Sequence, residues 1–198
     1  WLSPRRGLIL PGNFIPLFEK SELIVKLDRY MFEHACRWYR SHLEQGGRPV
    51  SLAVNVSKAG LFQNDFVDYY TDIKAKYSIP DRVMELEFTE SILAADTELF
   101  AELVVNLNAR GFICSLDDFG SGYSSLNLLK NLPIDVLKLD ILFFQKSRDI
   151  RRERIVVSNV INMAKELDIK TIAEGVEDMD TVEFLRKAGC NVIQGYVF

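Results

Sequence analysis

The stretch FICSLDDFGSGYSSL, residues 112–126, indicates how this chain folds. It begins as an apolar run suited to a buried strand and ends in two neighbouring carboxylates, Asp117 and Asp118. Asp and Gly are ordinary turn residues, so a solvated turn is one interpretation. Both carboxylates can face the same way only if the chain is already turning there, which Gly120 and Gly122 would permit. The groups that these two carboxylates face must be supplied by other strands of the chain.

The same arrangement recurs along the chain. Strands are predicted at 51–57, 83–90, 111–118, 136–140, 170–176 and 191–198, and helices at 21–44, 60–77, 96–109, 122–131, 150–167 and 179–187. Strands that alternate with helices of this length predict a largely parallel sheet. Each strand begins apolar and carries a chemically capable residue near its end: Asn55, Glu87, Asp117 with Asp118, Lys138 with Asp140, Glu174, and Gln194.

The fold class follows from these strand ends. A doubly wound sheet gathers ligands only at a topological switch point, whereas a (β/α)8 barrel brings all its carboxyl-terminal strand ends into one ring. Six contributing strands favour an α/β fold, a (β/α)8 TIM-type barrel that lacks its N-terminal strand region. We expect one domain over residues 1–198, with both ends trimmed.

Composition narrows the function further. The net charge of −4 gives no basic surface, which argues against duplex nucleic acid or an anionic membrane surface as the main partner. Three scattered cysteines without a CxxC motif argue against disulfides and zinc. No apolar run has transmembrane length and no signal pattern opens the chain, so we expect a cytoplasmic domain, with a membrane anchor elsewhere in the protein left open.

The predicted ring is rich in carboxylates. Carboxylates that crowd together repel one another unless some are protonated or cations lie between them. Oxygen ligands without His or Cys suit hard ions such as Mg²⁺, Mn²⁺ or Ca²⁺. An Asp that bridges two such ions, with its neighbour on the second ion, is the layout of a two-metal phosphoester hydrolase. Lys138 could then orient the attacking hydroxide or stabilise charge on the phosphoryl oxygens.

Seven short strings carry a family resemblance that extends over essentially the whole chain. In order they are FIPLFE, AVNVS, ELEFTES, SLDDFGSGYSSL, LPIDVLKLD, TIAEGVE and QGYVF, and they resemble the motifs of the EAL domain family. Members of that family are (β/α)8-type barrels that hydrolyse the bacterial messenger cyclic di-GMP to linear pGpG with two Mg²⁺ or Mn²⁺ ions. For this chain, the resemblance implies cyclic di-GMP as substrate and a homodimer, and leaves open an upstream GGDEF or sensor domain.

The resemblance also implies roles for individual residues. The metal ligands would be Asn55, Glu87, Asp117, Asp118 and Glu174, with Asp140 close to the metals and Asp117 bridging both ions. Lys138, Glu174 and Gln194 would be the catalytic residues that act on water and substrate. Glu90 matches a glutamate that steadies the loop after DDFG, and Glu177 matches a supporting residue. Glu85 shares a strand face with Glu87, and we interpret it as a barrel or supporting residue.

Two departures from the family pattern bear on activity. The glutamate of the namesake EAL motif is a metal ligand and should lie a few residues before Trp1, outside this sequence. A glutamate there would complete a hydrolytic site. A degenerate motif would instead make the chain an inert EAL-like module that binds cyclic di-GMP or a protein partner. In the DDFG loop, Ser121 stands for the usual Thr and keeps the hydroxyl.

Overall fold

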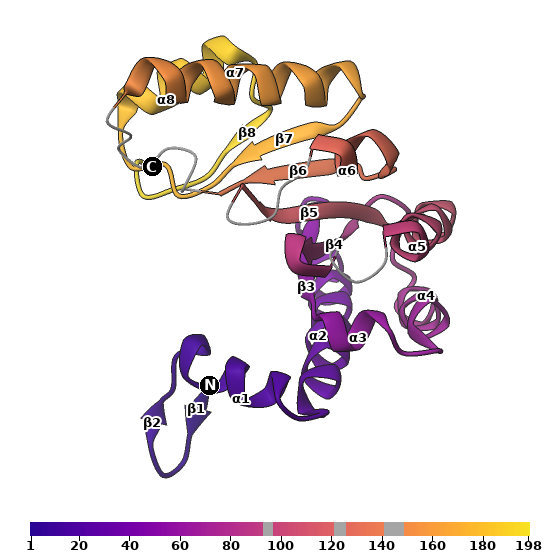
Figure 1. Ribbon diagram of the computed structural model, residues 1–198. Helices are drawn as coiled ribbons and strands as arrows, with labels where there is room; N and C mark the ends of the chain where they lie inside the picture. The colour runs from indigo at the N-terminus through magenta and orange to yellow at the C-terminus, as the bar shows by residue number, and fades with distance from the viewer. Residues whose placement is uncertain (93–96, 121–125, 141–148) are drawn as a thin grey trace. The chain divides into compact units, whose positions relative to one another are not determined.

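A computed structural model describes residues 1–92, 97–120, 126–140 and 149–198 (Figure 1). Ser121 and Gly122 of the DDFG loop, discussed above from the sequence, lie outside these ranges. The chain divides into two compact units, Trp1–Met84 and Glu85–Phe198. Each unit is described by itself, and the prediction of one domain over the whole chain stays a prediction.

The first unit is mainly helical. It comprises an antiparallel pair, β1 (Leu2–Ser3) and β2 (Gly7–Leu8), then α1 (Pro11–Glu19), α2 (Leu23–Glu44), β3 (Leu52–Val56), α3 (Lys58–Leu61) and α4 (Phe66–Lys76). The long helix α2 buries Ile24, Asp28, Phe32, Cys36 and Tyr39, whose spacing of three or four residues places them on one helix face. The predicted helix at 60–77 is two helices, because Ser57 caps the short α3 and a turn at 62–65 precedes α4.

The second unit contains the parallel sheet. Its elements are β4 (Met84–Thr89), η1 (Glu90–Ile92), α5 (Thr97–Ala109), β5 (Ile113–Phe119), α6 (Leu126–Asn131), β6 (Val136–Leu139), α7 (Ile150–Glu166), β7 (Lys170–Ala173), α8 (Met179–Ala188) and β8 (Val192–Ile193). The strands pair in chain order from β4 to β8, and every pair is parallel. Helices α7 and α8 lie on one side of β7 and β8 (Figure 1). The predicted alternation of strands and helices is therefore confirmed.

Hydrogen bonds from side chains fix the strand register at the amino-terminal ends. Asp135, just before β6, accepts a hydrogen bond at Oδ2 from the backbone N–H of Cys114 at 2.8 Å. Asn191, just before β8, accepts one at Oδ1 from the N–H of Thr171, also at 2.8 Å. In both places a polar side chain ahead of one strand binds the backbone of the previous strand. A slip of one residue between the paired strands would break this contact and turn each side chain of the shifted strand to the opposite face of the sheet.

The last strand is much shorter than predicted. Residues 191–198 were expected to form a strand, but only Val192–Ile193 does. A Cβ on Gly195 would overlap the backbone of Val176, so the chain crosses very close to the segment after β7 and leaves the strand geometry there. Within the described residues, no helix is long and apolar enough to cross a membrane.

Candidate functional site

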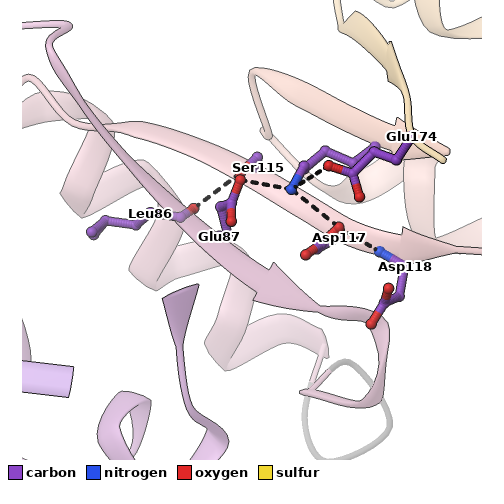
Figure 2. Close-up of polar contacts among 7 residues, drawn as sticks. Leu86, Glu87, Ser115, Asp117, Asp118 and Glu174 are labelled. Carbon is purple, nitrogen blue, oxygen red and sulfur yellow. Dashed lines mark hydrogen bonds and ion pairs between the residues drawn. The ribbon is translucent and has the colours of Figure 1, made fainter. Parts of the chain in front are cut away.

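Four neighbouring strands of the second unit bring their polar residues together around one ammonium group. Lys138 of β6 lies with its Nζ 2.7 Å from Glu87 Oε1, 2.8 Å from Glu174 Oε1 and 3.3 Å from Asp117 Oδ1. Figure 2 shows these carboxylates, from β4, the end of β7 and β5, converging on one point. Sequence alone placed these residues at strand ends, and the structure brings all three carboxylates within ion-pair distance of Lys138.

Burial makes these contacts strong. The side chain of Lys138 is 8% exposed, and those of Glu87, Asp117 and Glu174 are 10%, 13% and 24% exposed. Burial alone would lower the pKa of Lys138, but hydrogen bonds to Glu174 and Glu87 outweigh it and raise that pKa above its ordinary value. Lys138 therefore remains an ammonium at neutral pH and serves as a counter-ion inside the site.

One ammonium does not balance the negative charge of the site. Burial raises the pKa of Glu87, and although Lys138 opposes this effect, the charges of Asp117 and Glu85 add to it. Burial also raises the pKa of Asp118, and the next largest cause is the adjacent charge of Asp117. Carboxylates whose ionised forms are disfavoured by their neighbours gain from any added cation.

The doubled aspartate is accommodated by a bend in β5. The register with β6 shifts between Leu116 and Phe119, and Asp118 has a positive φ of 57°. The N–H of Asp118 donates to Asp117 Oδ1 at 2.9 Å (Figure 2). Gly120 follows with a φ of 100°. The turn expected from the two glycines is thus already present at Asp118, a residue type that tolerates this left-handed conformation.

Glu90 contacts the same bend. It lies in η1 after β4, is 6% exposed, and accepts a hydrogen bond at Oε2 from the N–H of Gly120 at 3.4 Å. This contact joins the end of β4 to the end of β5. Glu85, also buried at 9% exposure, lies on β4 and carries an Oε1 without a hydrogen-bond partner in the described part of the chain.

Three other predicted site residues lie near strand ends of this unit. Asp140 comes directly after β6. Its N–H donates to Phe119 O at 3.4 Å, so Asp140 lies beside the end of β5. Gln194 is exposed, and its backbone bonds both Ala173 and Val176, at 2.8 and 3.1 Å. Glu177 is exposed in the loop before α8. The charge of Asp140 is among the causes that raise the pKa of Asp118, after burial and the charge of Asp117.

Asn55 belongs to the first unit. It is exposed on β3, while its neighbours Val54 and Val56 are buried. The structure also shows a residue that sequence reasoning missed: Asp28 of α2 is 7% exposed and binds the end of this strand through Ser57. An aspartate within the apolar face of a predicted helix was the signal that could have revealed it.

The donor atoms fit a hard divalent cation. Among the described residues, no three His, Cys, Asp or Glu side chains are arranged as a metal cage, and two carboxylates pair with the Lys138 ammonium. Carboxylate oxygens that already converge on one cation, with excess negative charge around them, are the ligand type that Mg²⁺ and Mn²⁺ take. The set contains no sulfur or imidazole ligand.

Comparisons with known proteins find similar sequences over the whole chain. The model of the EAL domain family matches residues 1–198. The bifunctional diguanylate cyclase/cyclic di-GMP phosphodiesterase MucR of Pseudomonas aeruginosa is 36% identical over 197 residues, covering 100% of this chain and 29% of that protein. The cyclic di-GMP phosphodiesterase NbdA of the same organism is 35% identical, and the match covers 100% of this chain and 25% of that protein. The chain thus spans roughly a quarter of the length of these relatives.

Solved structures match just as fully. The PaMucR phosphodiesterase in complex with c-di-GMP has a TM-score of 0.90 and 37% identity, covering 100% of this chain and 80% of that chain. The EAL domain of Mycobacterium smegmatis DcpA has a TM-score of 0.80 and 32% identity, over 88% of this chain and 79% of that one. These likenesses confirm the predicted α/β fold of the TIM-barrel type with some strands lacking. The chain belongs to the EAL domain family.

Proposed function

We propose that this chain is the catalytic domain of a phosphodiesterase that hydrolyses cyclic di-GMP to linear pGpG. The observation that carries the proposal is the convergence of Glu87, Asp117 and Glu174 on the ammonium of Lys138 at neighbouring strand ends. Strand ends of this kind form the active sites of TIM-type barrels. Relatives named cyclic di-GMP phosphodiesterases and a similar structure that holds c-di-GMP support the same substrate.

The residues that would hold two Mg²⁺ or Mn²⁺ ions are Asn55, Glu87, Asp117, Asp118 and Glu174, with Asp140 beside them. When bound, such ions neutralise phosphate charge and lower the pKa of water to near neutrality. The raised pKa values of Glu87 and Asp118 support this assignment: burial is the main cause of both rises, the charge of Asp117 adds to each, and an added cation would offset both effects.

Lys138 has two tasks in this proposal. Its contacts with three carboxylates hold their oxygens in one orientation, so less rearrangement is needed when substrate arrives. Its ammonium also stays charged, and a preorganised donor of this kind stabilises negative charge that develops on a phosphoryl oxygen or on the attacking water. Gln194 would add a neutral amide to the same ring.

The test is hydrolysis by the full-length protein. Cyclic di-GMP is incubated with the protein and Mg²⁺ or Mn²⁺, and pGpG is measured by chromatography. We expect linear product with either ion, no product after chelation with EDTA, and poor activity with Ca²⁺, whose looser coordination suits a two-metal displacement badly.

Two variants separate chemistry from folding. Asp117→Asn should abolish turnover and leave the circular dichroism spectrum unchanged. Asp178→Asn, at the exposed start of α8, is the control and should keep full activity. Cyclic di-GMP binding without pGpG, in a protein that carries a glutamate in the expected position before Trp1, would refute the hydrolase and support the receptor alternative. The proposed homodimer is checked separately by light scattering.

A further inference from the structure

A buried carboxylate outside the catalytic cluster holds the end of a strand. Asp28 lies on the face of α2 that otherwise buries Ile24, Phe32, Cys36 and Tyr39, and it is 7% exposed. A carboxylate in such surroundings is costly unless hydrogen bonds satisfy it. Proteins that carry an apolar side chain of similar size in such a position are often just as stable, so core packing alone does not require an aspartate here.

The hydrogen bonds of Asp28 all lead to one turn. Its Oδ2 accepts from the N–H of Ser57 at 3.0 Å and from the hydroxyl of Ser57 at 2.5 Å. The Ser57 Oγ in turn accepts from the N–H of Gly60 at 3.0 Å, which caps α3. A Cβ on Gly60 would lie only 2.6 Å from Asp28 Oδ2. The turn from β3 into α3 is therefore built closely around this one carboxylate oxygen.

Ser57 follows Asn55 by two residues, directly after the last residue of β3. Val54 and Val56 are buried, and the side chain of Asn55 is exposed on the opposite face of the strand. The direction of Asn55 thus depends on the backbone of a short strand whose end Asp28 fixes. A shift of the Ser57 backbone would move Asn55 with it.

We propose that Asp28 is a positioning residue for Asn55 and that it sets the affinity of the site for Mg²⁺. The proposal rests on the proposed function, in which Asn55 is a metal ligand. Asp28 touches neither metal nor substrate and acts only through Ser57. Partners that orient metal ligands commonly change affinity by about 10–100-fold when they are removed.

The test is a double-mutant cycle read by calorimetric titration of the intact protein with Mg²⁺ alone. Asp28→Ala should weaken Mg²⁺ binding about tenfold in the wild-type background and cause no further loss when Asn55→Ala is already present. Asp28→Asn keeps an acceptor oxygen for Ser57 and should restore most of the affinity. Equal losses in both backgrounds would overturn the proposal, as would wild-type affinity in Asp28→Ala.

A matched control separates positioning from general stability. Asp135→Ala removes an equivalent carboxylate that accepts a backbone N–H at the amino-terminal end of the sheet. It should lower the urea midpoint yet leave Mg²⁺ affinity unchanged, and an equal loss of affinity would overturn the proposal. Ser57→Ala removes only the hydroxyl contacts, so it provides the same comparison if Asp28→Ala does not fold. Failure of wild-type protein to bind Mg²⁺ or form pGpG would instead count against the proposed function.

Discussion

Replacement of Lys138 by Met removes the ammonium at the centre of the site and keeps an apolar stem of similar length. Three carboxylates would then lie together without their cation. Removing one partner of a buried ion pair costs about 3–5 kcal/mol. Because Glu174 keeps 24% exposure and water can solvate part of its charge, we expect the lower end, about 3 kcal/mol, in protein treated with EDTA.

Urea unfolding followed by circular dichroism measures this loss. With an m-value of roughly 2 kcal/mol per molar urea, the midpoint should fall by about 1.5 M. Lys187→Met is the matched control, since Lys187 is 75% exposed and lies 3.6 Å from a single partner, Glu183. An exposed pair of this kind contributes at most about 1 kcal/mol.

The loss of stability in Lys138→Met should depend on pH in a defined direction. The pKa of Glu87 is raised by burial, so protonation of this carboxyl favours the folded state. The stability that this protonation contributes is lost as pH rises through the raised pKa of Glu87. Without Lys138, which opposes this rise, the pKa of Glu87 should be higher still. The gap between Lys138→Met and wild type should therefore narrow between about pH 7.5 and pH 5. The raised pKa of Lys138 keeps it charged throughout this window.

Two outcomes would refute this reasoning. One is a Lys138→Met midpoint as close to wild type as that of Lys187→Met. The other is a deficit of the same size at both pH values, because uncompensated carboxylate charge would then not be its cause.

Three further substitutions test local features. Asp118→Ala should cost about 1–2 kcal/mol because Ala tolerates a φ of 57° poorly, whereas Asp118→Gly should lie closer to wild type; urea midpoints in EDTA compare them, and equal values would argue against the bend. Asp178→Ala should lower the free energy of unfolding by about 1 kcal/mol, because Asp178 caps α8 by accepting from the N–H of Thr181 at 2.8 Å. Asp178→Asn keeps the cap, and thermal unfolding compares the two variants. Equal unfolding temperatures would contradict the capping role. Gly195→Ala should reduce turnover by displacing Gln194, since its Cβ would overlap the carbonyl of Val176; an active, equally stable variant would disprove the close crossing.

Much of the fold was predictable because its signal is local. Apolar runs that alternate with amphipathic segments gave strand positions to within one or two residues from β3 to β6, whereas β7 begins at the predicted residue and ends three residues earlier than predicted. The error at 191–198 arose because Gly195 must approach Val176 closely, a contact between segments almost twenty residues apart in sequence. No pattern within residues 191–198 reveals such a crossing.

The members of the cluster around Lys138 could be predicted from the sequence, but their contacts could not. Parallel strands place their ends at one edge, so Glu87, Asp117, Lys138 and Glu174 could be grouped from position alone. That Lys138 would touch all three carboxylates depends on side-chain lengths and on the register between strands. Asp28 escaped notice because its partner Ser57 lies 29 residues away and the aspartate sits in a stretch that reads as ordinary helix.

The contacts of Asp135 and Asn191 have a consequence for which substitutions this chain can tolerate. They align neighbouring strands at the amino-terminal ends, while the groups proposed for catalysis lie at the carboxyl-terminal ends. Alignment of the strands therefore does not depend on the reactive groups. Substitutions at the carboxyl-terminal ends, one residue at a time, could therefore remove the proposed activity and still leave a folded protein. An enzyme and a sensor could in this way be separated by few mutations, with no unfolded intermediate between them.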